Sequence, residues 1–178
     1  VGFNVNQLET WLPELLAEEP AMITIHARTR KEMSKVSARW EEVKRGVEIR
    51  NRLNSKTLIF GNGDVKNLNE AKQKAIETGC DGVMLGRAIF GNPWLFSERD
   101  PQKISIKEKL QVLTEHTKLF EELLGGVKNF AVMKKHFKAY VHGWDGAREL
   151  RAQLMETQNA KEVEETIWGY LKFYNIQK

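Results

Sequence analysis

The stretch Thr57-Leu58-Ile59-Phe60-Gly61-Asn62-Gly63-Asp64 decides the fold class, because a short apolar run here ends in a glycine-rich turn. The same arrangement stands on both sides of it in the sequence. Met22–Ile25 ends at His26-Ala27-Arg28-Thr29-Arg30, and Gly82–Leu85 ends at Gly86-Arg87. Short, continuously apolar strands with helices between them are typical of a parallel sheet that is covered on both faces.

Helical patterns separate these strands and continue alone after them. Helices are expected at 7–18, 38–51 and 67–78, the last with Gly79 as its C-cap. A closed β/α barrel has eight strands, so three strands predict only the back part of one. Beyond Asp100-Pro101 the sequence predicts helices alone, at 105–124 and around 130–140, 147–154 and 163–174. We therefore predict an α/β partial TIM barrel of about three βα units over 1–100, followed by an all-α helical bundle over 101–178.

Composition indicates a soluble globular protein with two basic regions. The 178 residues are 41% hydrophobic and 29% charged, with a formal net charge of +4. Basic residues gather in two regions, 28–52 and 126–151. They could bind an anionic partner, but charge alone favours the simpler interpretation that they lie on solvated helix faces. Cys80 is the single cysteine, which argues against a metal site built from several cysteines and is typical of a reducing compartment. We expect Cys80 to be buried and to have a packing role. No membrane segment is expected, and the start at Val1 suggests a piece of a longer protein.

The second and third strand ends are suited to binding a phosphate. Gly63 and Gly86 let the backbone approach a ligand closely, and the helix starts that follow offer free N–H groups. Arg87 adds a fixed positive charge with a forked set of donors. Adjacent strand ends late in a barrel commonly hold a phosphate. The alternative is that these glycines only make tight turns.

The first strand end carries side chains that could contact a ring. The imidazole of His26 could hydrogen-bond a ring carbonyl or transfer a proton, or it could be purely structural. Arg28 and Arg30 are two residues apart and would face opposite sides of an extended chain. One could then meet substrate and the other a carboxylate, or both could be solvated.

Together these motifs resemble the tRNA-dihydrouridine synthases. The resemblance rests on His26-Ala27-Arg28-Thr29-Arg30, Gly61-Asn62-Gly63-Asp64, Asp81–Arg87 and Gly91-Asn92-Pro93-Trp94, in this order and at this spacing. It is strong over 22–96 and weaker in the basic run Lys135–Tyr140. Ala27 departs from the family pattern, which usually has glycine there. The family consists of FMN enzymes with a TIM barrel and a C-terminal helical domain that holds tRNA.

The resemblance implies an oxidoreductase that reduces the C5–C6 double bond of specific tRNA uridines, with FMN as cofactor and NADPH or NADH as electron donor. His26 would contact the flavin ring or the target uracil, and Arg28 would help to place either one. The cofactor would be bound by His26, Asn62, Gly63, Asp64, Gly86 and Arg87. The tRNA would be bound by Arg28, Arg30, Lys134, Lys135 and Lys138. The lysines are assigned because their helical spacing sets them off the apolar stripe of Phe130, Met133 and Phe137. A cytoplasmic location and no metal are expected, and the sequence does not indicate an oligomeric state.

Two features of the family are absent from this sequence. The catalytic cysteine lies in the first half of the family's barrel, and a flavin-contacting lysine lies just upstream of a segment like Val1-Gly2-Phe3. Cys80 stands in the wrong element to replace that cysteine, so no catalytic residue is expected here and the chain alone should be inactive. Two alternatives remain open: an FMN-barrel dehydrogenase of a small pyrimidine, and a non-catalytic RNA-binding module.

Overall fold

A computed structural model describes residues 1–97 and 99–176 of the protein. The chain divides into two compact units, Val1–Ile89 and Phe90–Lys178. The boundary expected at Asp100-Pro101 falls inside the second unit. The assignment of separate functions to residues 1–100 and 101–178 stays a prediction.

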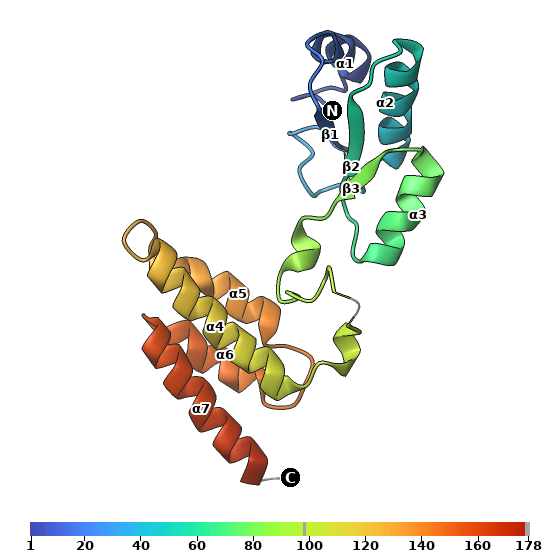
Figure 1. Ribbon diagram of the computed structural model, residues 1–178. Helices are drawn as coiled ribbons and strands as arrows, with labels where there is room; N and C mark the ends of the chain where they lie inside the picture. Colours follow the sequence, from blue (N-terminus) through green and yellow to red (C-terminus); the bar gives the residue numbers. More distant parts are fainter. Residues whose placement is uncertain (98, 177–178) are drawn as a thin grey trace. The chain divides into compact units, whose positions relative to one another are not determined.

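The first unit is a mixed α/β structure with a parallel sheet in the order β1-β2-β3 (Figure 1). Its elements are α1 (Leu8–Ala17), β1 (Met22–His26), α2 (Trp40–Arg52), β2 (Leu58–Asn62), α3 (Leu68–Thr78) and β3 (Gly82–Met84), followed by a short 3-10 helix, η1 (Arg87–Ile89). The predicted alternation of strands and helices is confirmed. The predicted cap of α3 is also confirmed, because Gly79 ends the helix with a left-handed φ of 70°.

All three helices of this unit pack on one face of the sheet. Ile25 and Ile59 are buried on that face, and the ring of Trp40 in α2 lies over Gly61 so closely that a side chain at Gly61 would collide with it. On the other face the described residues leave Met22 and Leu58 each 44% exposed. The prediction of a sheet covered on both faces is therefore wrong for the described part of the chain. The reason is that residues i and i+2 of a strand share a face, and no described element packs against this second set.

Cys80 packs at the end of α3, as predicted. It is 7% exposed, and its thiol donates to the carbonyl oxygen of Gly82 at 3.2 Å. It therefore belongs to the core of the first unit.

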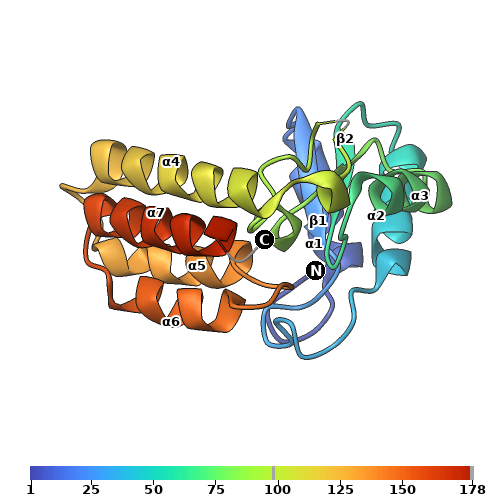
Figure 2. The same ribbon diagram turned by 90° about the horizontal axis from the view of Figure 1, so that it is seen from below.

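The second unit consists of helices around a core of their own. Its α-helices are α4 (Ile106–Leu124), α5 (Lys134–Tyr140), α6 (Ala147–Glu156) and α7 (Ala160–Ile176), and its 3-10 helices are η2 (Pro101–Lys103) and η3 (Phe130–Met133). Helix α4 lies beside α7, and α5 lies beside α6 (Figure 2). Leu110, Phe137 and Leu150 are fully buried between the helices.

One expected helix of the second unit is divided in two. The pattern over 130–140 predicts a single helix, but the structure has η3 followed by α5. The apolar residues Phe130 and Met133 are three apart, which is the period of a 3-10 turn. The Asn129 side chain caps η3 by accepting a hydrogen bond from the Ala131 N–H at 2.8 Å.

Candidate active site

The carboxyl ends of the three strands bring the predicted cofactor residues to one edge of the sheet. The strand register pairs His26 with Asn62, and Asn62 with Met84. Gly86 and Arg87 follow β3, separated from it by Leu85. The first-unit residues expected to form a site are therefore brought together.

Asn62 links all three strand ends through hydrogen bonds. Its side-chain Oδ1 lies 2.5 Å from Nδ1 of His26, and its Nδ2 donates to the carbonyl oxygen of Met84 at 2.7 Å. Its backbone carbonyl accepts from the N–H of Ala27 at 3.0 Å. The His26 ring, on the exposed end of β1, is thus fixed at one nitrogen.

Asp64 is the acceptor for two arginines. Its Oδ2 accepts from the guanidinium of Arg28 and, at 2.9 Å, from the backbone N–H of Ala38. Its Oδ1 accepts from Arg87 at 2.9 Å. The Arg28 guanidinium beside it is the main reason that the pKa of Asp64 lies below its usual range. Two cations around one carboxylate leave a net positive charge at this edge.

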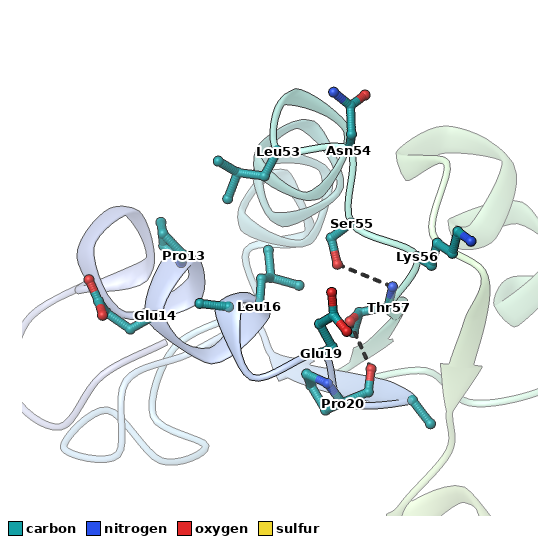
Figure 3. A pocket seen from close by; sticks show the side chains of 12 residues that line it. Pro13, Glu14, Leu16, Glu19, Pro20, Leu53, Asn54, Ser55, Lys56 and Thr57 are labelled. Carbon is teal, nitrogen blue, oxygen red and sulfur yellow. Dashed lines mark hydrogen bonds between the residues drawn. The ribbon is translucent and has the colours of Figure 1, made fainter.

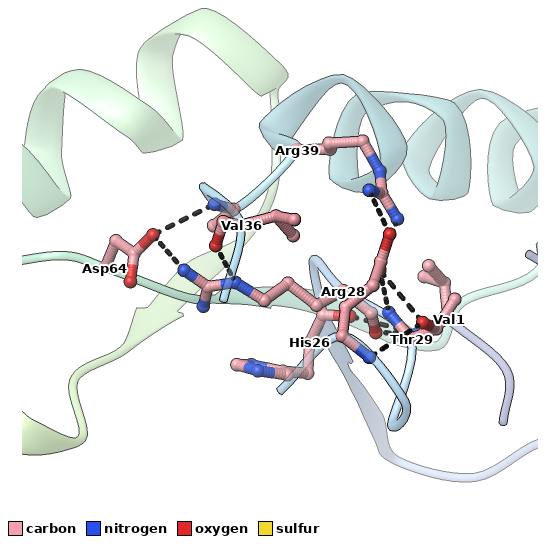
Figure 4. Close-up of polar contacts among 9 residues, drawn as sticks. Val1, His26, Arg28, Thr29, Val36, Arg39 and Asp64 are labelled. Carbon is pink, nitrogen blue, oxygen red and sulfur yellow. Dashed lines mark hydrogen bonds and ion pairs between the residues drawn. The ribbon is translucent and has the colours of Figure 1, made fainter. Parts of the chain in front are cut away.

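Arg28 is a buried side chain rather than a free one. The side chain is 3% exposed, and its guanidinium lies between the carbonyl oxygen of Val36, at 2.6 Å from Nε, and the carboxylate of Asp64 (Figure 4). Of the two predicted roles, it takes the carboxylate one here, and its contact with substrate stays a prediction. Arg30 is exposed, with its guanidinium 5.4 Å from the ring centre of Phe3, and its tRNA contact also stays a prediction.

The two glycines of the predicted phosphate site, Gly63 and Gly86, differ in whether the local structure requires a glycine. Gly63 has φ of 136°, and a Cβ there would lie 2.7 Å from Cβ of Ala38. This positive φ and this collision mean that the turn itself requires glycine. The carbonyl of Gly63 also accepts from the indole of Trp40 at 3.0 Å. A Cβ on Gly86 would meet nothing within 4 Å, so packing does not require glycine there. Space beside Gly86 is open to a ligand.

Glu32 holds the loop that follows β1, although it is not among the residues predicted from the sequence. Its carboxylate accepts from the backbone N–H of Thr29 at 2.8 Å, from the Thr29 hydroxyl at 2.9 Å and from both terminal nitrogens of Arg39. The hydrogen bonds from Arg39 are the main reason that the pKa of Glu32 is lowered to about 2. The signal was present as the capping-box pattern Thr29-x-x-Glu32.

Replacing Glu32 with glutamine is expected to make stability less sensitive to acid. A carboxyl with a lowered folded-state pKa stabilises the fold above its ordinary pKa of 4.5, and this contribution is lost as the pH falls from there toward about 2. Denaturant titrations at pH 7 and pH 3 would measure the difference. The stability gap between the parent and Glu32→Gln should be wider at pH 7, and an equal gap at both values would contradict the assignment.

In the second unit, the three predicted tRNA-binding lysines lie on α5. Lys135 and Lys138 are exposed and Lys134 is half-buried, while Met133 and Phe137 are buried on the other side. The predicted apolar stripe is therefore confirmed. The Nζ atom of Lys135 lies 5.8 Å from the ring centre of Phe90.

A separate pocket of about 680 Å³ lies at the opposite end of the strands (Figure 3). Residues just before β1 and β2 line it, and the Thr57 hydroxyl donates to the carbonyl oxygen of Pro20 at 2.7 Å. In barrel enzymes the amino ends of the strands serve stability, and the carboxyl ends carry the chemistry. We therefore assign no function to this pocket.

Over residues 1–97 and 99–176, no cluster of three or more histidine, cysteine, aspartate or glutamate side chains is arranged to hold a metal ion. Within the same ranges, no helix has the length and apolar character needed to cross a membrane.

Comparison with known proteins supplies the family. Residues 15–174 match the family described as "Dihydrouridine synthase (Dus)". A "Probable tRNA-dihydrouridine synthase" of Staphylococcus epidermidis is 39% identical over 166 residues, which are 93% of this chain and 51% of that protein. A protein of the same name from Staphylococcus aureus is 38% identical over 90% of this chain and 49% of its own length. "Probable tRNA-dihydrouridine synthase 2" of Bacillus subtilis is 37% identical, with the same coverage of both chains. The chain thus spans about half the length of the curated relatives it matches.

Proposed function

The chain belongs to the dihydrouridine synthase family, and we propose that it forms the cofactor-phosphate and tRNA-binding part of an FMN-dependent tRNA-dihydrouridine synthase. The enzyme would reduce the C5–C6 double bond of uridines in tRNA, with NADPH or NADH as electron donor, in the cytoplasm. The observation that carries the proposal is the net positive edge built by Arg28, Asp64 and Arg87 at the carboxyl ends of parallel strands. A small-pyrimidine dehydrogenase is disfavoured, since the family match extends through both units.

The partial barrel is part of this proposal, and three features of the first unit support it. Helices cover one face of the sheet, Met22 and Leu58 are exposed on the other face, and β1 and β3 are the edge strands among the described residues. A barrel would bury that second face in its interior and pair both edges. We also propose that α4 to α7 form the helical tRNA-binding domain.

The donor set at the strand ends fits an FMN phosphate. The Arg87 side chain is 67% exposed and forms one described ion pair, so the rest of its donor fork is available. The open space beside Gly86 admits a phosphate, and the arginines outnumber the one carboxylate. FMN, when bound, would supply the hydride for the reduction.

The residues of this chain would bind and orient rather than react. Arg87 would hold the phosphate, Asn62 would fix the ring of His26, and Arg28 would keep Asp64 charged and in place. His26 would contact the flavin ring or the uracil. The uridine has to leave the base stack to reach such a site. The proton for uracil C5 would come from a cysteine that this sequence lacks.

A chimera tests the proposed function. We would join the N-terminal half of the Staphylococcus epidermidis relative ahead of Val1 and measure dihydrouridine in unmodified tRNA. The chimera is expected to form dihydrouridine, and the 178-residue chain alone is expected to form none. A chimera that folds and binds flavin but leaves the uridines intact would count against the proposal. Turnover by the chain alone would refute the missing cysteine as the proton donor.

Replacing Arg87 with alanine in the chimera is expected to weaken FMN binding about ten- to a hundredfold. The change removes a charge-assisted contact to phosphate, worth roughly 1.5–3 kcal/mol. Flavin fluorescence titration measures the dissociation constant. Arg45→Ala is the matched control, since Arg45 lies in the same unit but pairs with Glu9 on the surface. An unchanged constant for Arg87→Ala would remove Arg87 from the phosphate site.

A further inference from the structure

The hydrogen bonds of Asn62 determine which nitrogen of His26 carries the proton. The backbone carbonyl of Met84 can only accept, so the Asn62 atom that faces it at 2.7 Å must be the Nδ2 donor. The other amide atom, Oδ1, then faces Nδ1 of His26 at 2.5 Å, and an amide oxygen can only accept. Nδ1 of His26 must therefore be the donor of this hydrogen bond.

We propose that Asn62 is a positioning residue that holds neutral His26 as the Nδ1–H tautomer, with Nε2 kept as a bare acceptor. Within the described part of the chain, Nε2 makes no hydrogen bond, and the His26 residue is exposed at the end of β1. In a neutral histidine, the hydrogen bond made by one ring nitrogen sets the state of the other. The carbonyl of Met84 thus orients the amide of Asn62, and this amide in turn determines that Nε2 of neutral His26 is unprotonated.

This tautomer restricts what His26 can bind. A bare Nε2 accepts a hydrogen bond from an N–H or O–H group or takes up a proton, but it cannot donate to a carbonyl. The sequence alone allows a ring carbonyl as the partner of His26, but the Nδ1–H tautomer of neutral His26 requires an N–H or O–H donor as the partner of Nε2. The role toward a ligand rests on the proposed function, whereas the tautomer rests only on the contacts of Asn62.

A purely structural role for Asn62 makes a different prediction. Asn62 also ties β1 to β2 through its backbone, and its loss could simply loosen the strand ends. Such loosening would lower the free energy of unfolding, but it would not move the proton from Nδ1 to Nε2 of His26. The tautomer is therefore the readout that separates positioning from strand pinning.

The experiment is nitrogen NMR of the 178-residue chain with 15N-labelled histidine, at a pH where histidine is neutral. Protonated and bare ring nitrogens resonate in well-separated regions, and His26→Gln identifies the His26 signals among the four histidines. The expected result is a protonated Nδ1 and a bare Nε2. Asn62→Asp, which keeps an acceptor, should retain this pattern, while Asn62→Leu should shift His26 toward a protonated Nε2. Asn67→Ala is the control, because it removes the α3 cap and should leave the tautomer unchanged.

Two outcomes would overturn the proposal. A protonated Nε2 in the parent chain would overturn it directly. A retained Nδ1–H tautomer in Asn62→Leu would show that Asn62 is not what holds it. If the leucine variant does not fold, Asn62→Ala takes its place with the same criterion. Because no FMN or tRNA is present, a failure here is distinct from a failure of the proposed function.

Discussion

Replacing Asp64 with alanine is expected to destabilise the first unit by about 3 kcal/mol, roughly a hundredfold in the folding equilibrium. The variant leaves the Arg28 side chain, which is 3% exposed, without its counter-charge and with one carbonyl partner. Removing one partner of a buried ion pair costs about 3–5 kcal/mol. The lower end applies because the Asp64 side chain is 37% exposed. Amide hydrogen exchange in β2 measures the loss in this unit separately from the second one.

Two further variants test the reason for this loss. Glu9→Ala breaks ion pairs with Arg45 and Arg52 in which all the side chains are at least half exposed, and it should cost less than about 1 kcal/mol. Arg28→Met combined with Asp64→Leu removes both charges and should recover part of the loss. An Asp64→Ala variant as stable as Glu9→Ala would show that the buried guanidinium does not need its partner.

The strands could be located from the sequence because their signal is local. Apolar runs mark β1, β2 and β3, but β2 runs from Leu58 to Asn62 instead of 57–60. Gly61 and Asn62 are not apolar, yet they continue the ladder by pairing with Ile25 and His26. Hydrophobicity records which side chains are buried, whereas a strand ends where its backbone pairing ends.

The beginning of α2 shows the same limit. The pattern predicts a helix from residue 38, but α2 begins at Trp40. The N–H of Ala38 instead donates to Asp64, which lies 26 residues away in the sequence. No local pattern around residue 38 carries that information.

The location of the site could be predicted from the sequence, but the network of ion pairs and hydrogen bonds within it could not. The glycines and Arg87 marked the strand ends, and register brought them to one edge. The burial of Arg28 could not be predicted, because arginine is usually exposed and its partner Asp64 lies 36 residues away. The Thr29–Glu32 pair is the opposite case, since its pattern is local and was readable.

The second large effect is expected from lysines on the surface of α5, which we propose to bind tRNA. Lys134 and Lys138 are four residues apart and share a face of the helix, away from buried Phe137. In the described ranges neither lysine forms an ion pair, so their charge is not neutralised by a neighbouring carboxylate. Two unpaired cations on one helix face support the proposed contact of this unit with phosphates of the tRNA backbone.

Replacing both Lys134 and Lys138 with glutamate is expected to weaken tRNA binding about a hundredfold at low salt, with FMN binding unchanged. Two charge-assisted contacts of about 1.5 kcal/mol each account for this loss. The slope of log affinity against log salt should also fall by about 0.7–0.9 for each contact. Binding of unmodified tRNA across a salt series measures both effects.

Lys107→Glu with Lys161→Glu makes the same change in net charge on α4 and α7, and it should weaken binding far less. Equal loss in both double variants would indicate a general charge effect, and no loss in either would move the RNA contact to the basic region 28–52.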